Sequence, residues 1–369
     1  MLTSITLQNF KSFGEEQTIP LEPITVLVGP NNSGKSNLVS LARFIRNAAM
    51  GGAESAFKEE GGVRSVFHRP VARGGSMRIG WKVDDGTDTE GSYSIDLAPT
   101  SPTLVATPER EHFDLPRLAK DWAGSTGVPF SKLQSVVTGG PLTPPYGDAF
   151  RGIGLPLVTS REIKLALSAL RQDAEVVPEP VLAADGSGMA PVLALWRGAN
   201  LDQAAQLDAF IHKCLPEIAH VIVKPGPVPG ENRLWVQQTD GEQFDAAHIS
   251  DGVLSFIALA MHAIDAEPGA LLFIEEPEQS IHPRRIHDLV ELFRTIVYER
   301  KCQLVVVTHS PVLLHEFRDE PEAILLFRRS ETGTRVNALT HFPDLIEALT
   351  TRKADPGTML VDGFLNDPT

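Results

Sequence analysis

Eight consecutive residues near the start of the chain have the composition of a phosphate-binding loop. They read Gly29-Pro-Asn-Asn-Ser-Gly-Lys-Ser36, which is the spacing of a P-loop. An apolar run, residues 24–28, precedes them as a predicted buried strand, and an amphipathic helix follows. Backbone N–H groups and the positive end of the helix dipole would then face a phosphate. Lys35 would reach the outer phosphates, and the Ser36 hydroxyl would bind magnesium.

The motif therefore predicts a nucleotide site, and its expected contact residues are Gly29, Asn31, Asn32, Ser33, Gly34, Lys35, Ser36 and Asn37. The alternative is a glycine-rich turn that holds no ligand. The complete motif in its strand-loop-helix context disfavours that alternative.

Two adjacent carboxylates end a second apolar run. Residues 270–274 form a predicted buried strand, and Glu275 and Glu276 follow it. The carboxyl end of such a strand opens into the crevice where a nucleotide on a neighbouring P-loop would lie. We expect Glu275 to hold magnesium and Glu276 to orient and deprotonate a water. The alternative is a pair of acids that stabilises a helix N-terminus beginning near Pro277.

A histidine and a helix start supply two further candidates. His309 follows the apolar strand 303–308, so a parallel sheet would bring it to the same edge as a sensor of the terminal phosphate. Ser250 and Gly252 open a predicted helix at 251–266 and offer a hydroxyl and bare backbone to an anion. Taken alone, His309 is a loop or cap residue and Ser250 is a helix cap. Their significance comes from the other motifs.

The composition favours a cytoplasmic protein with no membrane span. Of 369 residues, 33 are Lys or Arg and 47 are Asp or Glu, which gives a net charge of -14. DNA contact would therefore need a local basic patch. Cys214 and Cys302 are far apart and lack metal-ligand spacing, which argues against a disulfide framework or a zinc site. The sequence contains neither a signal-like start nor 18 consecutive apolar residues.

The elements that must position the candidate residues fall into five segments. We assign residues 1–60 to the N-terminal part of the P-loop core, 61–110 to an antiparallel β layer and 111–219 to a helical insertion. Residues 220–341 form the C-terminal part of the core, and 342–369 form a short tail. Strands and helices alternate in the C-terminal part, which is typical of a mostly parallel sheet covered by helices. The predicted fold class is α/β, with the insertion splitting the core.

Two helices are expected inside the insertion. Thr159 and Glu162 have the spacing of a capping box that opens the first helix, and Asn200 and Gln203 open the second. Neither helix sustains three or four heptads, so a long coiled-coil arm is not expected.

Taken together, these motifs resemble the ABC-type ATPase head of RecF, SMC and OLD-family proteins, most closely the OLD-like predicted AAA ATPases of bacteria. The resemblance rests on Asn9-Phe-Lys-Ser-Phe13, the P-loop, Ile249-Ser-Asp-Gly252, Phe273-Ile-Glu-Glu-Pro-Glu-Gln-Ser-Ile-His-Pro283 and Val307-Thr-His-Ser-Pro311. It implies ATP and Mg²⁺ as ligands. It also implies that Ser250 and Gly252 touch the nucleotide of a second subunit, with residues 279–282 across the same interface.

Three features depart from that family's pattern. Glu275 stands at the magnesium position, where Asp is commoner. The glutamine loop expected after the P-loop helix has no clear place, and Gln134 and Gln172 are its candidates. Residues 331–369 are too few for the Toprim nuclease domain of full-length OLD proteins, so we do not expect nuclease activity in this chain.

The first functional hypothesis is an ATPase that forms a homodimer around ATP, because each chain offers one P-loop and one signature loop, the degenerate Ile249-Ser-Asp-Gly252 segment. It would act in a DNA-related process such as phage defence or DNA repair, with a separately encoded effector and DNA as possible partners. The alternative is a nucleotide-gated scaffold with negligible hydrolysis. A transporter motor subunit ranks lower, and the sequence lacks the Asn-Lys-x-Asp motif of a GTPase.

Overall fold

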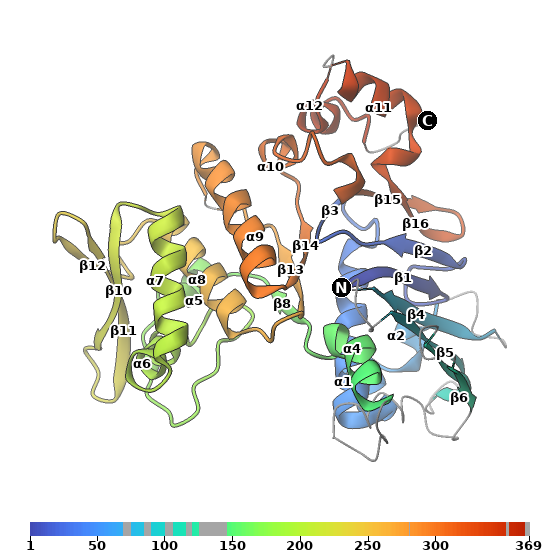
Figure 1. Ribbon diagram of the computed structural model, residues 1–369, viewed down its shortest axis with the longest axis horizontal. Coiled ribbons are helices and arrows are strands. Elements are labelled where there is room, and N and C mark those ends of the chain that lie inside the picture. The colour runs from blue at the N-terminus through green and yellow to red at the C-terminus, as the bar shows by residue number, and fades with distance from the viewer. Residues whose placement is uncertain are drawn as a thin grey trace.

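The strands that carry the candidate residues lie side by side in one mostly parallel six-stranded sheet (Figure 1). The computed structural model describes residues 1–68, 75–84, 90–99, 106–115, 120–124, 146–279, 281–351 and 354–365. The strand order in this sheet is β16 (Gly333–Ala338), β15 (Ile324–Ser330), β3 (Ile24–Val28), β14 (Gln303–Val307), β13 (Leu271–Glu275) and β8 (Arg161–Ile163). Only β16 runs antiparallel to its neighbour. The expected mostly parallel α/β core is confirmed.

Each central strand of this sheet is buried on both faces, because successive side chains point to opposite sides. In β3, Val26 and Val28 join one hydrophobic core, and Leu27 between them joins the other. In β13, Leu272 and Ile274 alternate with Leu271 and Phe273 in the same way. The near-continuous apolar runs in the sequence are explained by this double burial.

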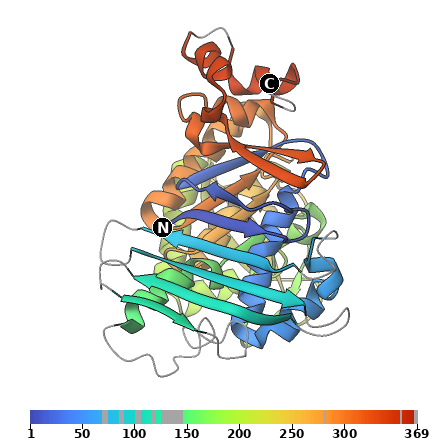
Figure 2. The same ribbon diagram turned by 90° about the vertical axis from the view of Figure 1, so that its right-hand side faces the viewer.

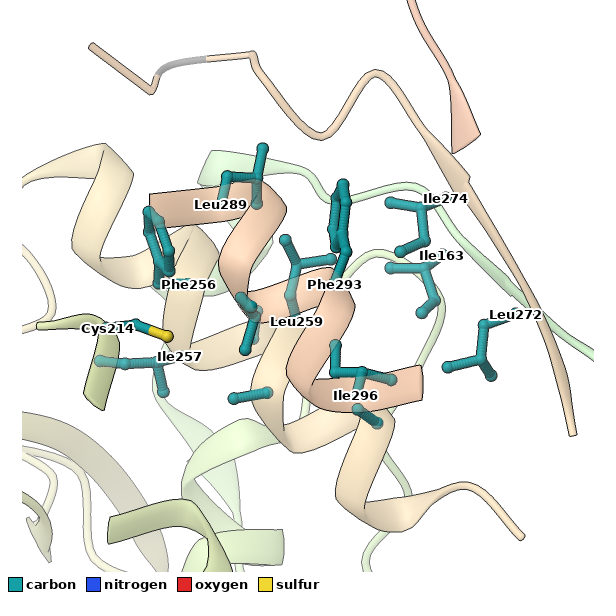
Figure 3. Close-up of a cluster of buried hydrophobic side chains, with 14 of the residues drawn as sticks. Ile163, Cys214, Phe256, Ile257, Leu259, Leu272, Ile274, Leu289, Phe293 and Ile296 are labelled. Atoms are coloured by element: carbon teal, nitrogen blue, oxygen red, sulfur yellow. The ribbon is translucent and has the colours of Figure 1, made fainter. Parts of the chain in front are cut away.

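Helices α8 (Asp251–Asp265) and α9 (Ile286–Arg300) cover the first face of the sheet. Figure 3 shows how their side chains meet those of the strands, with Leu259 and Phe293 packed near Ile163 and Ile274. Two further helices, α6 (Met189–Gly198) and α7 (Leu201–Cys214), extend this core away from the sheet. A small antiparallel sheet of β9 (Ala174–Glu175), β10 (Ile218–Pro225), β11 (Glu231–Gln238) and β12 (Gln243–Asp245) packs beside them.

The second face of the sheet is covered by helices α1 (Lys35–Glu59) and α4 (Tyr146–Val158) and by a six-stranded antiparallel sheet (Figure 2). The order in that sheet is β2 (Gln17–Pro20), β1 (Leu2–Gln8), β4 (Met77–Val83), β5 (Gly91–Pro99), β6 (Ala106–Leu115) and β7 (Lys120–Gly124). Helix α1 does not end at the Gly51-Gly52 pair. Its backbone breaks at Gly52, where φ is 85°, and the helix resumes.

The antiparallel layer is wider than residues 61–110. It takes β1 and β2 from the N-terminal segment, and β6 and β7 continue it to Gly124. The expectation of helix from Glu111 onward is therefore wrong over its first part. Strand β6 carries many charged residues and lacks apolar alternation, so its backbone pairing with β5 and β7 was not visible in the pattern.

The predicted helix opened by Thr159 and Glu162 is also wrong. Residues Arg161–Ile163 form β8, which pairs in parallel with β13 and places Ile163 in the core. The Thr159 hydroxyl instead donates to the Leu155 carbonyl at 2.8 Å, at the end of α4. Tertiary pairing here overrides a local capping signal. The helix that follows is short, α5 (Leu167–Leu170), whereas α7 begins directly after Asn200 as expected.

The remaining elements lie at the ends of the core. Short helices α2 (Val63–Val66), α10 (Pro311–His315), α11 (Pro343–Thr350) and α12 (Pro356–Val361) flank it, together with 3₁₀ turns at Pro283–Arg285, Pro321–Ala323 and Leu339–His341. Residues assigned to a tail thus form α11 and α12, and α12 lies beside α10 (Figure 1). Across the described ranges, every helix is too short or too polar to cross a membrane.

His262 makes the fold sensitive to acid. Its imidazole is 2% exposed in α8, and burial lowers its pKa from 6.5 to about 4. A lowered pKa means that the unfolded chain binds a proton below pH 6.5 whereas the folded chain does not until about pH 4. Stability is therefore lost as the pH falls through this window. Lowering the pH from 7 to 5 costs about 2 kcal/mol through His262 alone.

We expect His262→Leu to remove this acid-sensitive component. Urea unfolding at pH 7 and pH 5 should show a free-energy loss about 2 kcal/mol smaller in the variant than in the wild type. An equal loss in both proteins would show that His262 titrates normally in the folded state. His212→Leu, on the solvent-accessible side of α7, is the matched control.

Candidate nucleotide-binding site

The loop between β3 and α1 has the backbone that a phosphate cradle requires. Gly29 and Gly34 lie at φ 150° and 109°, and Asn32 lies at φ 64°. A Cβ on Gly29 would stand 2.2 Å from the Phe327 carbonyl oxygen, and one on Gly34 would stand 2.1 Å from the Thr334 hydroxyl. Glycine is therefore required at both positions by close packing as well as by φ. Gly34 caps the N-terminus of α1, so the helix dipole points at the loop.

Lys35 supplies the positive charge of the loop and is buried. Its ammonium donates to the Gly29 carbonyl at 2.5 Å and to the Pro30 carbonyl at 2.9 Å. Burial lowers its pKa to about 8, and the nearby Glu276 carboxylate opposes that shift. The ammonium remains largely protonated at neutral pH. It is held beside the cradle and available to an anion.

One cavity of about 330 Å³ brings the sequence-predicted residues together. Its lining consists of Asn31, Asn32, Ser33, Gly34, Lys35, Ser36, Asn37, Lys164, Glu275, Glu276, Val307 and His309. The P-loop, the two adjacent carboxylates and the histidine therefore face the same space. Gly29 contributes its carbonyl to Lys35 and does not line the cavity. Ser33 Oγ is buried and, within the described ranges, has no hydrogen-bond partner.

The donor set fits a hard divalent cation. The Ser36 hydroxyl and the Glu275 carboxylate line the same cavity, and magnesium prefers oxygen ligands of these kinds. One Glu275 oxygen, Oε2, accepts a hydrogen bond from the Lys164 ammonium at 2.7 Å. Lys164 was not among the predicted site residues. The parallel register of β8 with β13 places it there, and the sequence pattern of residues 159–170 did not reveal that pairing.

Glu276 has a left-handed backbone conformation, which is unusual for a residue other than glycine. Its φ is 46°, and its N–H donates to the Val307 carbonyl at 2.8 Å across the strand ends. Its Oε2 atom accepts a hydrogen bond from the Gln279 amide. A left-handed conformation at a non-glycine residue costs free energy and is concentrated at functional sites. The strain turns the Glu276 carboxylate toward the cavity that His309 and Lys35 also line.

Glu278 connects the acidic turn to the histidine. Its Oε1 accepts from the Thr308 hydroxyl at 2.6 Å and from the backbone N–H of His309 at 3.3 Å. Burial and the Lys35 charge lower the pKa of His309, so its imidazole is neutral at pH 7. The Glu-Pro-Glu run that contains Glu278 is visible in the sequence. The contact between Glu278 and Thr308, 30 residues apart, can be identified only from the structure.

Ser250 and Gly252 do not line this cavity. Ser250 is exposed and caps α8, with its hydroxyl accepting from the Val253 N–H at 3.4 Å. The glutamine candidates are likewise absent from the lining: Gln172 is exposed in a turn, and Gln134 lies outside the described residues.

One arginine holds the loop that leads to Ser250. The Arg171 guanidinium donates to the carbonyls of Ala246 at 2.6 Å, Ala247 at 2.8 Å and Ile249 at 2.9 Å. It also pairs with the Asp251 carboxylate. A planar fork with five donors suits several acceptors at once. Arg171 therefore fixes the conformation in which Ser250 begins the helix.

We expect Arg171→Ala to loosen this loop. Each lost charge-assisted hydrogen bond is worth about 1.5 kcal/mol or more, so amide exchange in residues 247–254 should rise at least about tenfold. Arg171→Lys should restore part of the protection, because an ammonium reaches fewer carbonyls. Arg197→Ala, which breaks a comparable pair with Asp208, is the control. Equal amide exchange in Arg171→Ala and wild type would show that Arg171 does not hold this loop in place.

The family comparison agrees with this geometry. A family model described as "AAA domain, putative AbiEii toxin, Type IV TA system" matches residues 24–315, which is more than half of the chain. The chain belongs to this AAA family. The matched range includes the P-loop, the two acidic residues at the end of β13 and His309. The expected resemblance to the ABC, SMC and RecF group of P-loop ATPases is confirmed.

Solved SMC head domains share the fold of this AAA protein. The SMC head domain from Thermotoga maritima is 14% identical, with a TM-score of 0.51, and the match covers 91% of this chain and 98% of that one. An SmcHead bound to the C-winged helix domain of ScpA is 13% identical, with a TM-score of 0.57, covering 91% and 97%. The Pyrococcus furiosus Smc head bound to the C-terminal domain of ScpA is 12% identical, with a TM-score of 0.52, covering 95% and 99%.

Curated relatives match over a short stretch. The chromosome partition proteins Smc of Mycobacterium tuberculosis and Halothermothrix orenii are each 51% identical over 45 residues. That stretch is 12% of this chain and 4% of each relative. The chain thus spans a small fraction of the length of these relatives.

Proposed function

We propose that this chain binds ATP with magnesium in the P-loop cavity and hydrolyses it in a site completed by a second copy. The observation that carries the proposal is the shared cavity, in which the P-loop, Glu275, Glu276 and His309 meet. Phosphoryl transfer needs cations and donors around the phosphate and a group that orients water. All of these are present at one sheet edge.

Each residue of the cavity has a distinct role in this proposal. Backbone N–H groups of the loop and the Lys35 ammonium bind the phosphates, and Ser36 with Glu275 holds Mg²⁺, which when bound neutralises phosphate charge. Glu276 accepts a proton from the attacking water. His309 donates to the terminal phosphate from the end of the neighbouring parallel strand β14.

A second cavity is suited to the nucleoside part of ATP. It measures about 630 Å³ and shares Asn32 and Asn37 with the phosphate cavity. Lys11, Arg64, Phe67 and His68 are among its other lining residues. Mixed apolar and polar walls of this kind fit a base and a ribose. Because the two cavities share these asparagines, one ATP molecule could occupy both in this proposal.

The position of Ser250 and Gly252 supports the proposed second copy. Ser250 is exposed and caps α8, Gly252 is half-buried in the first turn of that helix, and neither residue lines the chain's own cavity. A two-fold dimer would place the loop of each chain over the P-loop of the other, so that both sites are completed by the same contact. ATP bound at this interface would then favour the dimer.

We propose that ATP-driven dimerisation acts in a DNA-related process together with a separately encoded effector. The Smc relatives are named as chromosome partition proteins, and two of the solved heads carry parts of ScpA. Phage defence and DNA repair are the two processes that we propose, and the family description names a putative toxin of a type IV TA system. The Lys164–Glu275 ion pair supports one alternative, a nucleotide-gated scaffold with negligible hydrolysis.

Equilibrium binding of ATP, and the phosphate release and molecular mass of the purified chain with and without Mg-ATP, test this proposal. Multiple turnovers with ATP-dependent formation of a dimer support the enzyme. A dimer that binds ATP and releases no phosphate supports the scaffold. A chain that neither binds ATP nor changes its mass contradicts both functions.

A further inference from the structure

Lys164 stands opposite the expected magnesium-binding carboxylate because of strand register. Ile163 of β8 pairs with Ile274 of β13 in the parallel ladder. One residue further along the chain in each case, Lys164 faces Glu275, the last residue of β13, at the carboxyl edge of the sheet, and the ammonium lies 2.7 Å from Glu275 Oε2. The pairing is built into the core of the fold, since β8 is hydrogen-bonded to β13 along its length.

Lys164 also balances the charge of the cavity. The lining residues with formal charges are Lys35, Lys164, Glu275 and Glu276, so the lining is close to neutral. A lysine ammonium carries a positive charge at neutral pH. Without Lys164, the phosphates of ATP would meet an excess negative charge. Repulsion of that kind weakens anion binding at close range.

The Lys164 side chain has room to move while its backbone is fixed. Its N–H donates to the Ala184 carbonyl at 2.9 Å, but its side chain is 69% exposed. Four rotatable bonds let a lysine ammonium exchange one anionic partner for another nearby. The backbone of Lys164 is therefore held at the cavity wall, whereas its ammonium group is free to change position.

We infer that Lys164 is an exchangeable counter-cation of the nucleotide site. Without nucleotide it neutralises Glu275 and opposes a divalent cation at that carboxylate. When ATP enters, the ammonium moves from Glu275 to a phosphate oxygen and leaves the carboxylate free for Mg²⁺. The site would thus take up magnesium together with ATP and hold it poorly alone. This inference rests on the proposed function, because the proposed binding of ATP brings in the phosphates that Lys164 contacts after it leaves Glu275.

Two binding measurements on the full chain test this inference. The first is the affinity for Mn²⁺ without nucleotide, measured from the electron paramagnetic resonance signal of free Mn²⁺. Lys164→Gln should bind Mn²⁺ about 30-fold more tightly than wild type, which is the effect of one unit charge about 4 Å from a doubly charged ion in water. The second is the affinity for a fluorescent ATP analogue in EDTA, which should fall about fivefold in the same variant.

Lys164→Arg keeps the charge and should resemble wild type in both measurements. Lys82→Gln, which removes an exposed lysine from the antiparallel sheet, controls for the change in net charge. Mn²⁺ affinity in Lys164→Gln no higher than in wild type, including undetectable binding by both, would overturn the inference. Unchanged affinity for the analogue in EDTA would overturn the transfer to phosphate. Failure of the proposed function would appear differently, as absence of analogue binding by the wild type under all conditions.

Discussion

Glu276→Gln is expected to lower phosphate release by about 100- to 10,000-fold, the usual contribution of a positioned general base. The glutamine side chain has nearly the same shape, and its carbonyl oxygen can still accept from the Gln279 amide. It cannot take a proton from water at neutral pH. ATP binding should therefore persist. Because the bound ATP is not hydrolysed, it should hold the two chains together, and the dimer should accumulate.

Single-turnover phosphate release and light scattering with Mg-ATP check this expectation together. Glu267→Gln, an exposed carboxylate before β13, is the matched control and should behave as wild type. If Glu276→Gln turns over at the wild-type rate, Glu276 is not the base. If it loses ATP binding as well as turnover, Glu276 is needed for the shape of the turn, a result its φ of 46° would explain.

Lys35→Ala is expected to weaken ATP binding by about 10- to 100-fold, since one charge-assisted hydrogen bond is worth about 1.5–3 kcal/mol. The same change removes the bonds to the Gly29 and Pro30 carbonyls. Equilibrium binding of a fluorescent ATP analogue gives the affinity, and thermal unfolding shows whether the loop change affects stability. Lys58→Ala, on the exposed side of the same helix, is the control. Equal affinities in Lys35→Ala and wild type would remove Lys35 from phosphate binding.

The parts of the site carried by buried strands were predictable from the sequence. Residues 24–28, 270–274 and 303–308 are apolar runs with polar residues directly after them, and parallel pairing brings those residues to one edge. Lys35, Glu276 and His309 could therefore be assigned to one place without coordinates. Double burial of a central strand produces a strong signal of this kind.

The parts that depend on non-local pairing were not predictable. Strand β8 has three residues and overlaps a capping-box pattern, which predicts a helix where Lys164 lies. Arg171 contacts carbonyls about 75 residues further along the chain, and no periodicity marks such a contact. Strands β6 and β7 were missed because their pairing in the sheet is not accompanied by apolar alternation. Short strands at the edge of a sheet form because they pair with neighbouring strands that are distant in the sequence. The local sequence pattern contains no information about those neighbours.

A mixing experiment with two inactive variants tests the shared ATP site most directly. Lys35→Ala removes the P-loop function, and Ser250→Arg blocks the signature loop, so each homodimer should be inactive. A mixed dimer should contain one intact site, formed by the P-loop of the Ser250→Arg chain and the signature loop of the Lys35→Ala chain. Random mixing should therefore restore phosphate release to about a quarter of the wild-type value. A mixture no more active than either variant alone would contradict a site shared between two chains.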